Sequence, residues 1–227
     1  MQRGVLWRWV FMKSLLRALP FIGLLILTAC SSVQTLNSSS QLFEYNESQQ
    51  AASEIFQQWG DVLKRHAENN LKGENPACIQ SSSNDCQLHE WKEFLTELKG
   101  KPAMEQIMAV NDYVNQKTYK LDRENYGMND YWATPMEFLY KGGDCEDYAI
   151  TKLLSLLQLG FAPDSMRMVV LMDTKLKTPH AALALYTNDD ILILDNQTQD
   201  VVSHQRLSHY VPIYSINEKG WWIHASN

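Results

Sequence analysis

Residues 130–149 read DYWATPMEFLYKGGDCEDYA. Thr134, Pro135 and Glu137 take the positions of a capping box, in which a hydroxyl and a carboxylate pair with free N–H groups at a helix start and proline occupies the first helical position. This pattern predicts a short helix from Pro135 through Tyr140.

A second helix is predicted directly after the first. The glycine pair at 142–143 allows a tight turn, and Asp144 can cap a helix that runs from Cys145 to about Leu159, where Gly160 ends it. The sequence therefore predicts a cysteine at the first position of a helix.

Helices are predicted before this stretch and strands after it. Apolar residues recur at helical spacing over residues 47–70, 88–98 and 102–114. Five later segments have the length and composition of strands: Met166–Met172, His180–Thr187, Asp190–Asp195, Val211–Ile216 and Trp221–His224. Helices first and strands afterwards indicate an α+β fold with an antiparallel sheet, rather than a parallel doubly wound sheet.

The amino-terminal segment resembles an export signal. Residues 1–29 hold four basic residues and then an apolar run from Ala18 to Ala29, which is too short for a stable membrane-spanning helix. Residues 27–30, Leu-Thr-Ala-Cys, resemble a bacterial lipobox, which predicts a lipid on Cys30, and Ser31 resembles the pattern for sorting to the outer membrane. An uncleaved membrane anchor is the alternative, and both place the body outside the cytoplasm, in the periplasm.

The rest of the chain is predicted to form a tether and one domain. Residues 30–46 are polar and rich in serine, which is typical of a flexible linker. Residues 47–227 have enough length and apolar content for one packed domain. Translation from Met12 instead of Met1 would still give a complete signal, and the sequence leaves both starts open.

The body of the chain is acidic. The 227 residues have a formal net charge of −6, and because residues 1–29 carry four basic residues and no acid, the remainder stands at −10. Generic binding to nucleic acid depends on many Lys and Arg contacts to phosphates, so this composition argues against nucleic acid as a partner.

The four cysteines carry different expectations. Cys30 is assigned to the lipid. Cys78 and Cys86 flank a short polar stretch and can close a disulfide loop in an oxidising compartment, with two free thiols as the alternative. Cys145 has no evident partner, which marks it as a reactive thiol.

Cys145 has one favourable and one unfavourable feature for a nucleophile. A helix amino terminus stabilises a thiolate through its free N–H groups and its dipole. Asp144, Glu146 and Asp147, however, place three carboxylates beside the sulfur, and like charge raises the pKa of a thiol. A nucleophilic role therefore requires that these acids be neutralised; otherwise they are ordinary acids of a first helical turn.

The strands supply a candidate base and a group to orient it. A two-residue turn at 188–189 sets Asp195 opposite Ala182 and makes His180 and Asp195 diagonal neighbours on one face of the sheet, whereas a three-residue turn would reverse the face. We also expect Ala182 and Ala184, which are small, to admit a helix end on that face. The result is a Cys–His–Asp arrangement in which the histidine takes the thiol proton, with incidental placement of the three residues as the alternative.

The motifs at 130–139 and 142–149 resemble the bacterial transglutaminase-like cysteine proteinases of the LapG type, and the resemblance extends over roughly residues 50–220. It implies a papain/transglutaminase-like fold in which Cys145 is the nucleophile, His180 the base and Asp195 the orienting group. It also implies an endopeptidase that cleaves a giant surface adhesin near its amino terminus, which releases the adhesin and disperses the biofilm. The family is regulated by sequestration on an inner-membrane cyclic-di-GMP receptor.

The same resemblance implies calcium (Ca²⁺) beside the nucleophile. Asp144, Glu146 and Asp147 match the acidic cluster of the family, and Asn129 is a further candidate ligand, since carboxylate and carbonyl oxygens suit Ca²⁺. Trp132 matches a family tryptophan near the site, with a substrate or oxyanion contact and core packing as its two open roles.

Two features leave alternatives open. Family members are mostly soluble periplasmic proteins, so the lipobox is a departure from the family pattern. The same triad can also transfer an acyl group to an amine, as transglutaminases do, and a catalytically silent lipoprotein that binds calcium or a partner is a third function.

Overall fold

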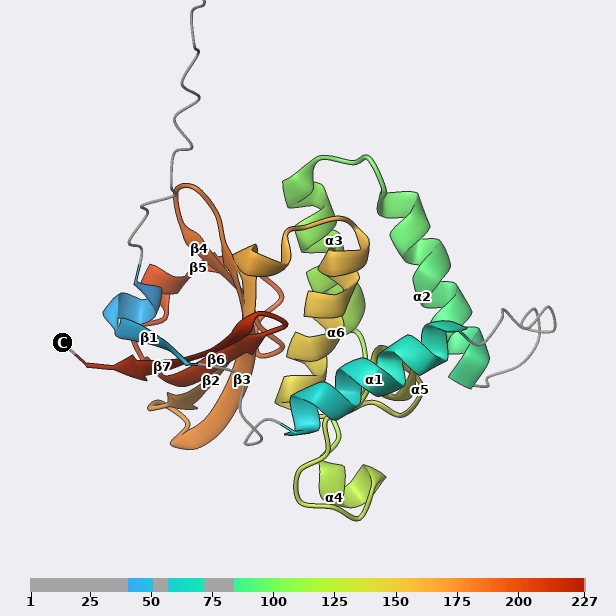
Figure 1. Ribbon diagram of the computed structural model, residues 1–227, viewed down its shortest axis with the longest axis horizontal. Coiled ribbons are helices and arrows are strands. Elements are labelled where there is room, and N and C mark those ends of the chain that lie inside the picture. Colours follow the sequence, from blue (N-terminus) through green and yellow to red (C-terminus); the bar gives the residue numbers. More distant parts are fainter. Residues whose placement is uncertain (1–40, 51–56, 72–83, 227) are drawn as a thin grey trace, which may run out of the picture. The chain divides into compact units, whose positions relative to one another are not determined.

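The computed structural model describes residues 41–50, 57–71 and 84–226. Helices cover one side of a single sheet (Figure 1), and α6 packs against both the sheet and the helices α3 and α5. The helices are α1 (Gln57–Leu71), α2 (Asn84–Leu98), α3 (Ala103–Asn115), α4 (Asp122–Asn125), α5 (Pro135–Lys141) and α6 (Cys145–Gln158). The strands are β1 (Asn46–Gln50), β2 (Met166–Asp173), β3 (Thr178–Tyr186), β4 (Ile191–Leu194), β5 (Val202–Ser203), β6 (Tyr210–Asn217) and β7 (Gly220–Ala225).

The sheet is antiparallel throughout, in the order β1-β7-β6-β2-β3-β4-β5. Tyr186 pairs with Ile191 and Leu183 with Leu194, so the β3–β4 connection has the predicted register, with residues 188–189 at its tip. The α+β class with an antiparallel sheet is therefore confirmed.

The two faces of the sheet contact different core clusters. Met168, Leu183 and Leu194 belong to the cluster formed with α6 and the other helices. Residues of the opposite parity, among them Val169 and Ile193, pack with an amino-terminal segment on the other face. This alternation follows from the period of two along a strand.

The predicted role of the two small residues of β3 is wrong. Ala182 and Ala184 do lie on one face, but they pack with the amino-terminal residues Leu42 and Phe43. Helix α6 instead shares its cluster with Leu183 and Leu185. The small side chains thus make room for a turn of 3₁₀ helix, and not for the end of α6.

The boundary of the predicted tether is also wrong. Residues 42–44 form a 3₁₀ helix (η1) whose Leu42 is fully buried, and β1 then pairs with β7 as an edge strand. The helix predicted over 47–70 accordingly begins, within the described residues, only at Gln57. Polar edge strands such as β1 lack the apolar alternation that reveals a strand in a sequence.

The remaining expectations on the amino-terminal part lie outside the described residues. These include the signal, Cys30, most of the tether and Cys78. Cys86, at the start of α2, is disulfide-bonded, and its pairing with Cys78 stays a prediction. A membrane span would need a longer and more apolar helix than any in the described part of the chain.

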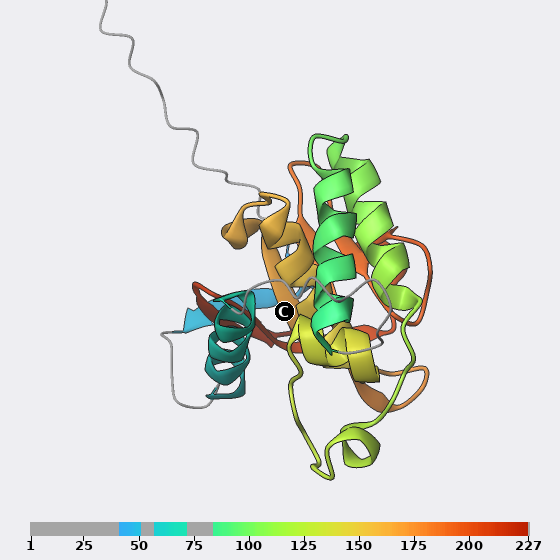
Figure 2. The same cartoon turned by 90° about the vertical axis from the view of Figure 1, so that its right-hand side faces the viewer.

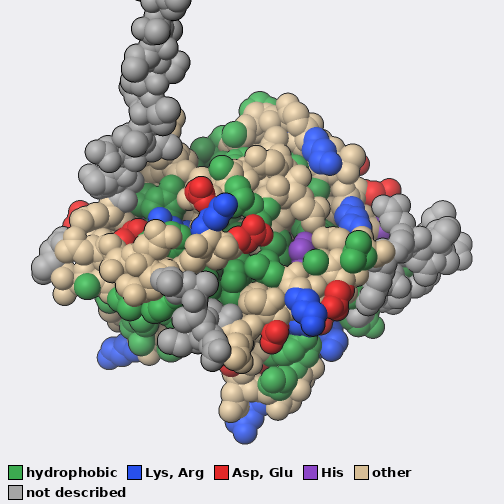
Figure 3. Space-filling model, viewed as in Figure 1, with side chains coloured by type: hydrophobic (Ala, Val, Ile, Leu, Met, Phe, Trp, Pro, Cys, Tyr) green, Lys and Arg blue, Asp and Glu red, His purple; other side chains and the backbone are tan. Residues whose placement is uncertain are grey.

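The charged side chains are spread over the surface. On the face shown in Figure 3, the described Lys and Arg side chains are dispersed among acidic, polar and apolar ones. A loop that carries α4 extends from the helical side of the domain in both Figure 1 and Figure 2, and it supplies two acids to the site described next.

Leu42→Ala tests whether the amino-terminal segment is part of the folded domain. Because the side chain is fully buried, we expect the substitution to lower the free energy of unfolding by about 2–5 kcal/mol, measured by chemical denaturation. Gln41→Ala, at an exposed neighbouring residue, serves as the control. Equal stability of Leu42→Ala and the wild type would mean that the tether extends to Asn46 as the sequence predicts.

Candidate active site

The loop before α6 depends on two glycines. Gly142 has a φ of 78°, and a Cβ there would lie 2.2 Å from the carbonyl oxygen of Thr118. A Cβ on Gly143 would lie 2.0 Å from Oδ2 of Asp147. Only glycine therefore lets residues 118–120 run beside this loop, where the Lys120 N–H donates to the Gly143 carbonyl at 2.8 Å.

Asp147 connects the start of α6 to the loop before α5. Its carboxylate accepts the N–H of Ala133 at 2.7 Å and the N–H of Asp144 at 3.2 Å, and the residue is fully buried. The second bond is half of a capping box at Asp144. Both carboxylate oxygens are thus used to hold backbone, and Cys145 occupies the first position of α6 as predicted.

His180 and Asp195 are paired as the strand register predicts. His180 Nε2 lies 2.9 Å from Asp195 Oδ1, and both residues are buried. The other oxygen, Oδ2, accepts the hydroxyl of Tyr210 at 2.6 Å. Burial raises the pKa of Asp195, but the hydrogen bonds and positive charge offered by His180 outweigh it and hold that pKa below its usual value.

Cys145 lies beside this pair in a pocket of about 260 Å³ that also contains His180. Because Nε2 is bonded to Asp195, Nδ1 is the imidazole nitrogen available to a thiol. The pocket is lined by Gln58, Asp130, Trp132, Cys145, Glu146, Val170, Pro179, His180, Ala181 and Tyr214.

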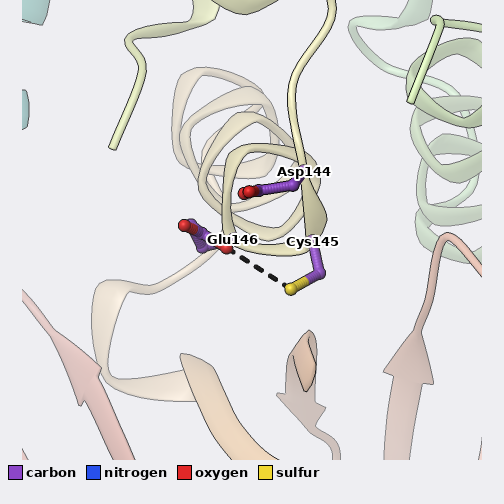
Figure 4. A group of neighbouring side chains, drawn as sticks. All are labelled: Asp144, Cys145 and Glu146. Atoms are coloured by element: carbon purple, nitrogen blue, oxygen red, sulfur yellow. Dashed lines mark hydrogen bonds between the residues drawn. The ribbon is translucent and has the colours of Figure 1, made fainter. Parts of the chain in front are cut away.

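The thiol is hydrogen-bonded to an acid in this structure. Cys145 Sγ donates to Glu146 Oε2 at 3.3 Å, and Figure 4 shows the two side chains turned toward each other at the start of the helix. Burial, followed by the charges of Glu146 and Asp144, raises the pKa of the thiol well above its usual range, while a backbone hydrogen bond from Ala181 acts in the opposite direction. Burial and the neighbouring acids therefore both favour the protonated thiol over the thiolate.

Five carboxylates gather around the start of α6, beside the sulfur. Asp122, Asp130 and Glu146 can each bring an oxygen within 4.8 Å of the others, and Asp122 does the same with Asp144 and Asp147. Asp122 and Asp130 lie on the loop that carries α4, and the sequence motif did not identify them. Asn129 is exposed, and it stays a prediction as a ligand.

The acids raise one another's pKa values. Burial, and then the charges of Asp144 and Asp130, raise the pKa of Asp122 to about 6, although a bond from the Tyr131 N–H lowers it. The pKa of Glu146 is also raised, first by burial and then by its hydrogen bond to Asp144. Negative charge on this cluster is therefore costly without a cation.

The donor set fits a hard divalent cation. Asp122 Oδ1 and Asp144 Oδ1 are buried, and neither has a hydrogen-bond partner among the described residues. Buried oxygens of this kind are normally paired, and carboxylate oxygens are the ligands that Ca²⁺ prefers. Asp122, Asp130, Asp144 and Glu146 are therefore the residues that would hold it. Asp147 also lies within reach of Asp122 and Asp144, and it stays a prediction as a ligand.

Trp132 packs in the core and also lines the pocket, and its substrate or oxyanion contact stays a prediction. Its ring packs edge-on against Trp59 with centroids 6.3 Å apart, and it also lines the pocket. Its indole N–H donates to Asp130 Oδ1 at 3.1 Å, so that donor is engaged by an acid of the cluster. Gln58 donates to the other oxygen of Asp130 at 2.6 Å, which links α1 to the same cluster.

Asp122→Asn tests the acid cluster without an assay of activity. The pKa of Asp122 in the folded protein is raised to about 6. At pH 8 the ionised side chain therefore lowers the free energy of unfolding of the metal-free protein, and this loss of stability diminishes as the pH falls below 6. In EDTA at pH 8 we expect Asp122→Asn to melt at or above the wild-type temperature. We expect added calcium to raise the melting temperature of the wild type and to have little effect on the variant.

Asp164→Asn removes an exposed acid elsewhere and should respond to calcium as the wild type does. A full calcium response in Asp122→Asn would exclude this residue from the metal site.

Comparison with known proteins identifies the family. The sequence model of one protein family, the bacterial transglutaminase-like cysteine proteinases (BTLCP), matches residues 76–227. No curated protein sequence matches the chain.

Solved structures of LapG from Legionella pneumophila are similar to the chain. One is 30% identical with a TM-score of 0.58, over 71% of this chain and 87% of that chain. The calcium-bound form is 28% identical with a TM-score of 0.57, over 72% and 86%, and the EGTA-treated form is 29% identical with a TM-score of 0.59, over 73% and 86%. The chain therefore belongs to the bacterial transglutaminase-like cysteine proteinases.

Proposed function

We propose that the protein is a calcium-dependent cysteine endopeptidase that cleaves the amino-terminal region of a large surface adhesin and so controls adhesin release and biofilm dispersal. The observation that carries the proposal is the His180–Asp195 pair in the same pocket as Cys145, which lies at the start of α6. Family membership supports proteolysis, and the resemblance to LapG supports the substrate class.

The chain's own residues suffice for acyl transfer to water. His180 Nδ1 takes the thiol proton, and the sulfur attacks the carbonyl carbon of the scissile peptide bond. The backbone N–H of Cys145 makes no bond within the helix at this position, and it would face the developing oxyanion. The imidazolium then gives its proton to the departing amine, which leaves a thioester on Cys145.

Hydrolysis of the thioester completes the cycle. His180 takes a proton from water, and the hydroxide attacks the thioester carbonyl. The bond between that carbon and the sulfur then breaks, the carboxylic acid departs, and the imidazolium returns its proton to the Cys145 sulfur. Asp195 keeps the imidazole oriented throughout and stabilises its charged form.

Calcium has an electrostatic part in this proposal. Asp122, Asp130, Asp144 and Glu146 would hold the ion, whose charge offsets the negative field that now keeps the thiol protonated. The existence of a calcium-bound and an EGTA-treated structure of Legionella LapG supports this assignment.

Location and regulation follow from the sequence and from the resemblance. We propose a periplasmic protein that is anchored through a lipid on Cys30, in the outer membrane rather than the inner membrane. An inner-membrane cyclic-di-GMP receptor that sequesters the protease would then have to reach an anchored enzyme.

The direct test incubates the purified protein, with calcium or with EGTA, with the amino-terminal region of a large adhesin from the same cell. We expect cleavage only with calcium, and weaker rescue by magnesium because the smaller ion demands stricter geometry. Cys145→Ala should abolish cleavage while changing the melting temperature little. His180→Ala should also abolish cleavage, and it should lower the melting temperature because buried Asp195 loses a partner. His89→Ala, a histidine substitution on α2, should cleave as the wild type does.

The products distinguish the competing functions. Free carboxyl ends support the endopeptidase, whereas new amide bonds to an added amine would show a transglutaminase. An intact adhesin under all conditions, together with an unlabelled Cys145 after treatment with an electrophilic thiol probe, would favour a silent binding lipoprotein.

A further inference from the structure

We propose that Tyr210 is a positioning residue for the Cys–His–Asp triad, and that the amino-terminal turn Leu42–Glu44 holds Tyr210 in place. The role of Tyr210 is to orient Asp195. The role of the turn Leu42–Glu44 is to hold Tyr210, which connects the amino-terminal segment to the site. Both depend on the catalytic roles proposed above for Asp195 and His180.

Tyr210 fixes the side of Asp195 that His180 does not contact. The tyrosine hydroxyl donates to Asp195 Oδ2 at 2.6 Å, while Oδ1 accepts from the Gln197 N–H at 2.9 Å and faces His180 Nε2 at the same distance. A carboxylate held by bonds on both oxygens cannot rotate without breaking at least one of them. The direction of the His180 imidazole is therefore set in part by Tyr210.

Tyr210 also shields the pair from water. The residue is 3% exposed, and its ring centroid lies 5.7 Å from that of His180 in a tilted contact. Exclusion of water strengthens the hydrogen bonds between His180 and Asp195, because the local dielectric constant falls.

The amino-terminal turn packs against the other side of Tyr210. The ring of Phe43 meets that of Tyr210 edge-on, with centroids 5.9 Å apart and an interplanar angle of 82°. The Phe43 N–H donates to Nδ1 of buried His204 at 2.9 Å. Burial lowers the pKa of His204, which agrees with a neutral imidazole that can accept this bond.

The backbone of this turn is unusual. Phe43 and Glu44 have φ values of 52° and 68°, a left-handed conformation that residues other than glycine rarely adopt. Such a conformation persists only where the surrounding contacts determine it, and strained residues of this kind concentrate at functional sites. The contacts here are the bond to His204 and the packing of Leu42 and Phe43 against the sheet.

Tyr210→Phe isolates the hydroxyl because the ring is retained. The measured quantity is the rate of alkylation of Cys145 by iodoacetamide in calcium at neutral pH, followed by mass spectrometry, which requires no adhesin. We expect the rate to fall about tenfold, since one hydrogen bond to a charged group is lost and the imidazole is less well oriented. The downfield N–H resonance of His180 in proton NMR should shift or broaden in the same variant.

Tyr186→Phe is the matched control. Tyr186 also donates to a half-buried carboxylate in this sheet, Glu47 at 3.0 Å, but it lies at the other end of β3 from His180. Its loss should lower stability and leave both the alkylation rate and the His180 resonance unchanged. Equal behaviour of the two variants would overturn the positioning role.

Phe43→Leu tests whether the amino-terminal turn holds Tyr210 in place, and it keeps an apolar side chain at residue 43. We expect the alkylation rate of Phe43→Leu to fall by about threefold, which is less than for Tyr210→Phe. Because Phe43 acts through Tyr210, the double variant Phe43→Leu/Tyr210→Phe should react as slowly as Tyr210→Phe alone. Additive losses would show that Phe43 does not act through Tyr210.

His180→Ala separates this inference from the proposed function. If His180→Ala alkylates as fast as the wild type, the histidine does not activate the thiol and the proposed function fails. If His180→Ala is slow and Tyr210→Phe is fast, the proposed function stands and the inference on Tyr210 is wrong.

Discussion

The site depends on one buried carboxylate. Asp147 is fully buried and accepts backbone N–H groups from Ala133 and Asp144, so it joins the loop before α5 to the first turn of α6. Gly143 makes this possible because any larger residue would collide with that carboxylate. With α6 started in this way, Cys145 is presented to the end of β3 where His180 lies. Burial raises the pKa of Asp147 well above its usual value, and the bonds from the Ala133 and Asp144 N–H groups act in the opposite direction.

The same construction gathers negative charge that the protein alone does not balance. Asp122 and Asp130 are brought in by the segment that runs beside the glycine pair, and they meet Asp144 and Glu146 next to the sulfur. The thiol therefore bonds to Glu146, and its raised pKa makes it a poor nucleophile in this state. A cation at the cluster would offset this charge, and this is the physical basis of the calcium dependence that we propose.

The sequence predicted the parts of the site that depend on local signals. Capping residues and glycines predicted the start of α6 at Cys145, and the two-residue turn predicted the pairing of His180 with Asp195. It missed Asp122 and Asp130 because their approach to the helix depends on the contact of residues 118–120 with the glycine pair, which no local pattern reveals. It also missed β1 and the burial of Leu42, because a polar edge strand after a serine-rich segment resembles a linker. Those residues gain their structure only from the sheet that receives them.

The most direct measurement is a crystal structure of the calcium-loaded protein at high resolution. We expect a calcium ion held by Asp122, Asp130, Asp144 and Glu146. The Cys145 sulfur should be turned from Glu146 toward Nδ1 of His180, and the His180–Asp195 bond should be retained. An ion bound elsewhere, or a sulfur that still bonds to Glu146 when the ion is present, would contradict the claim that this cluster controls the nucleophile.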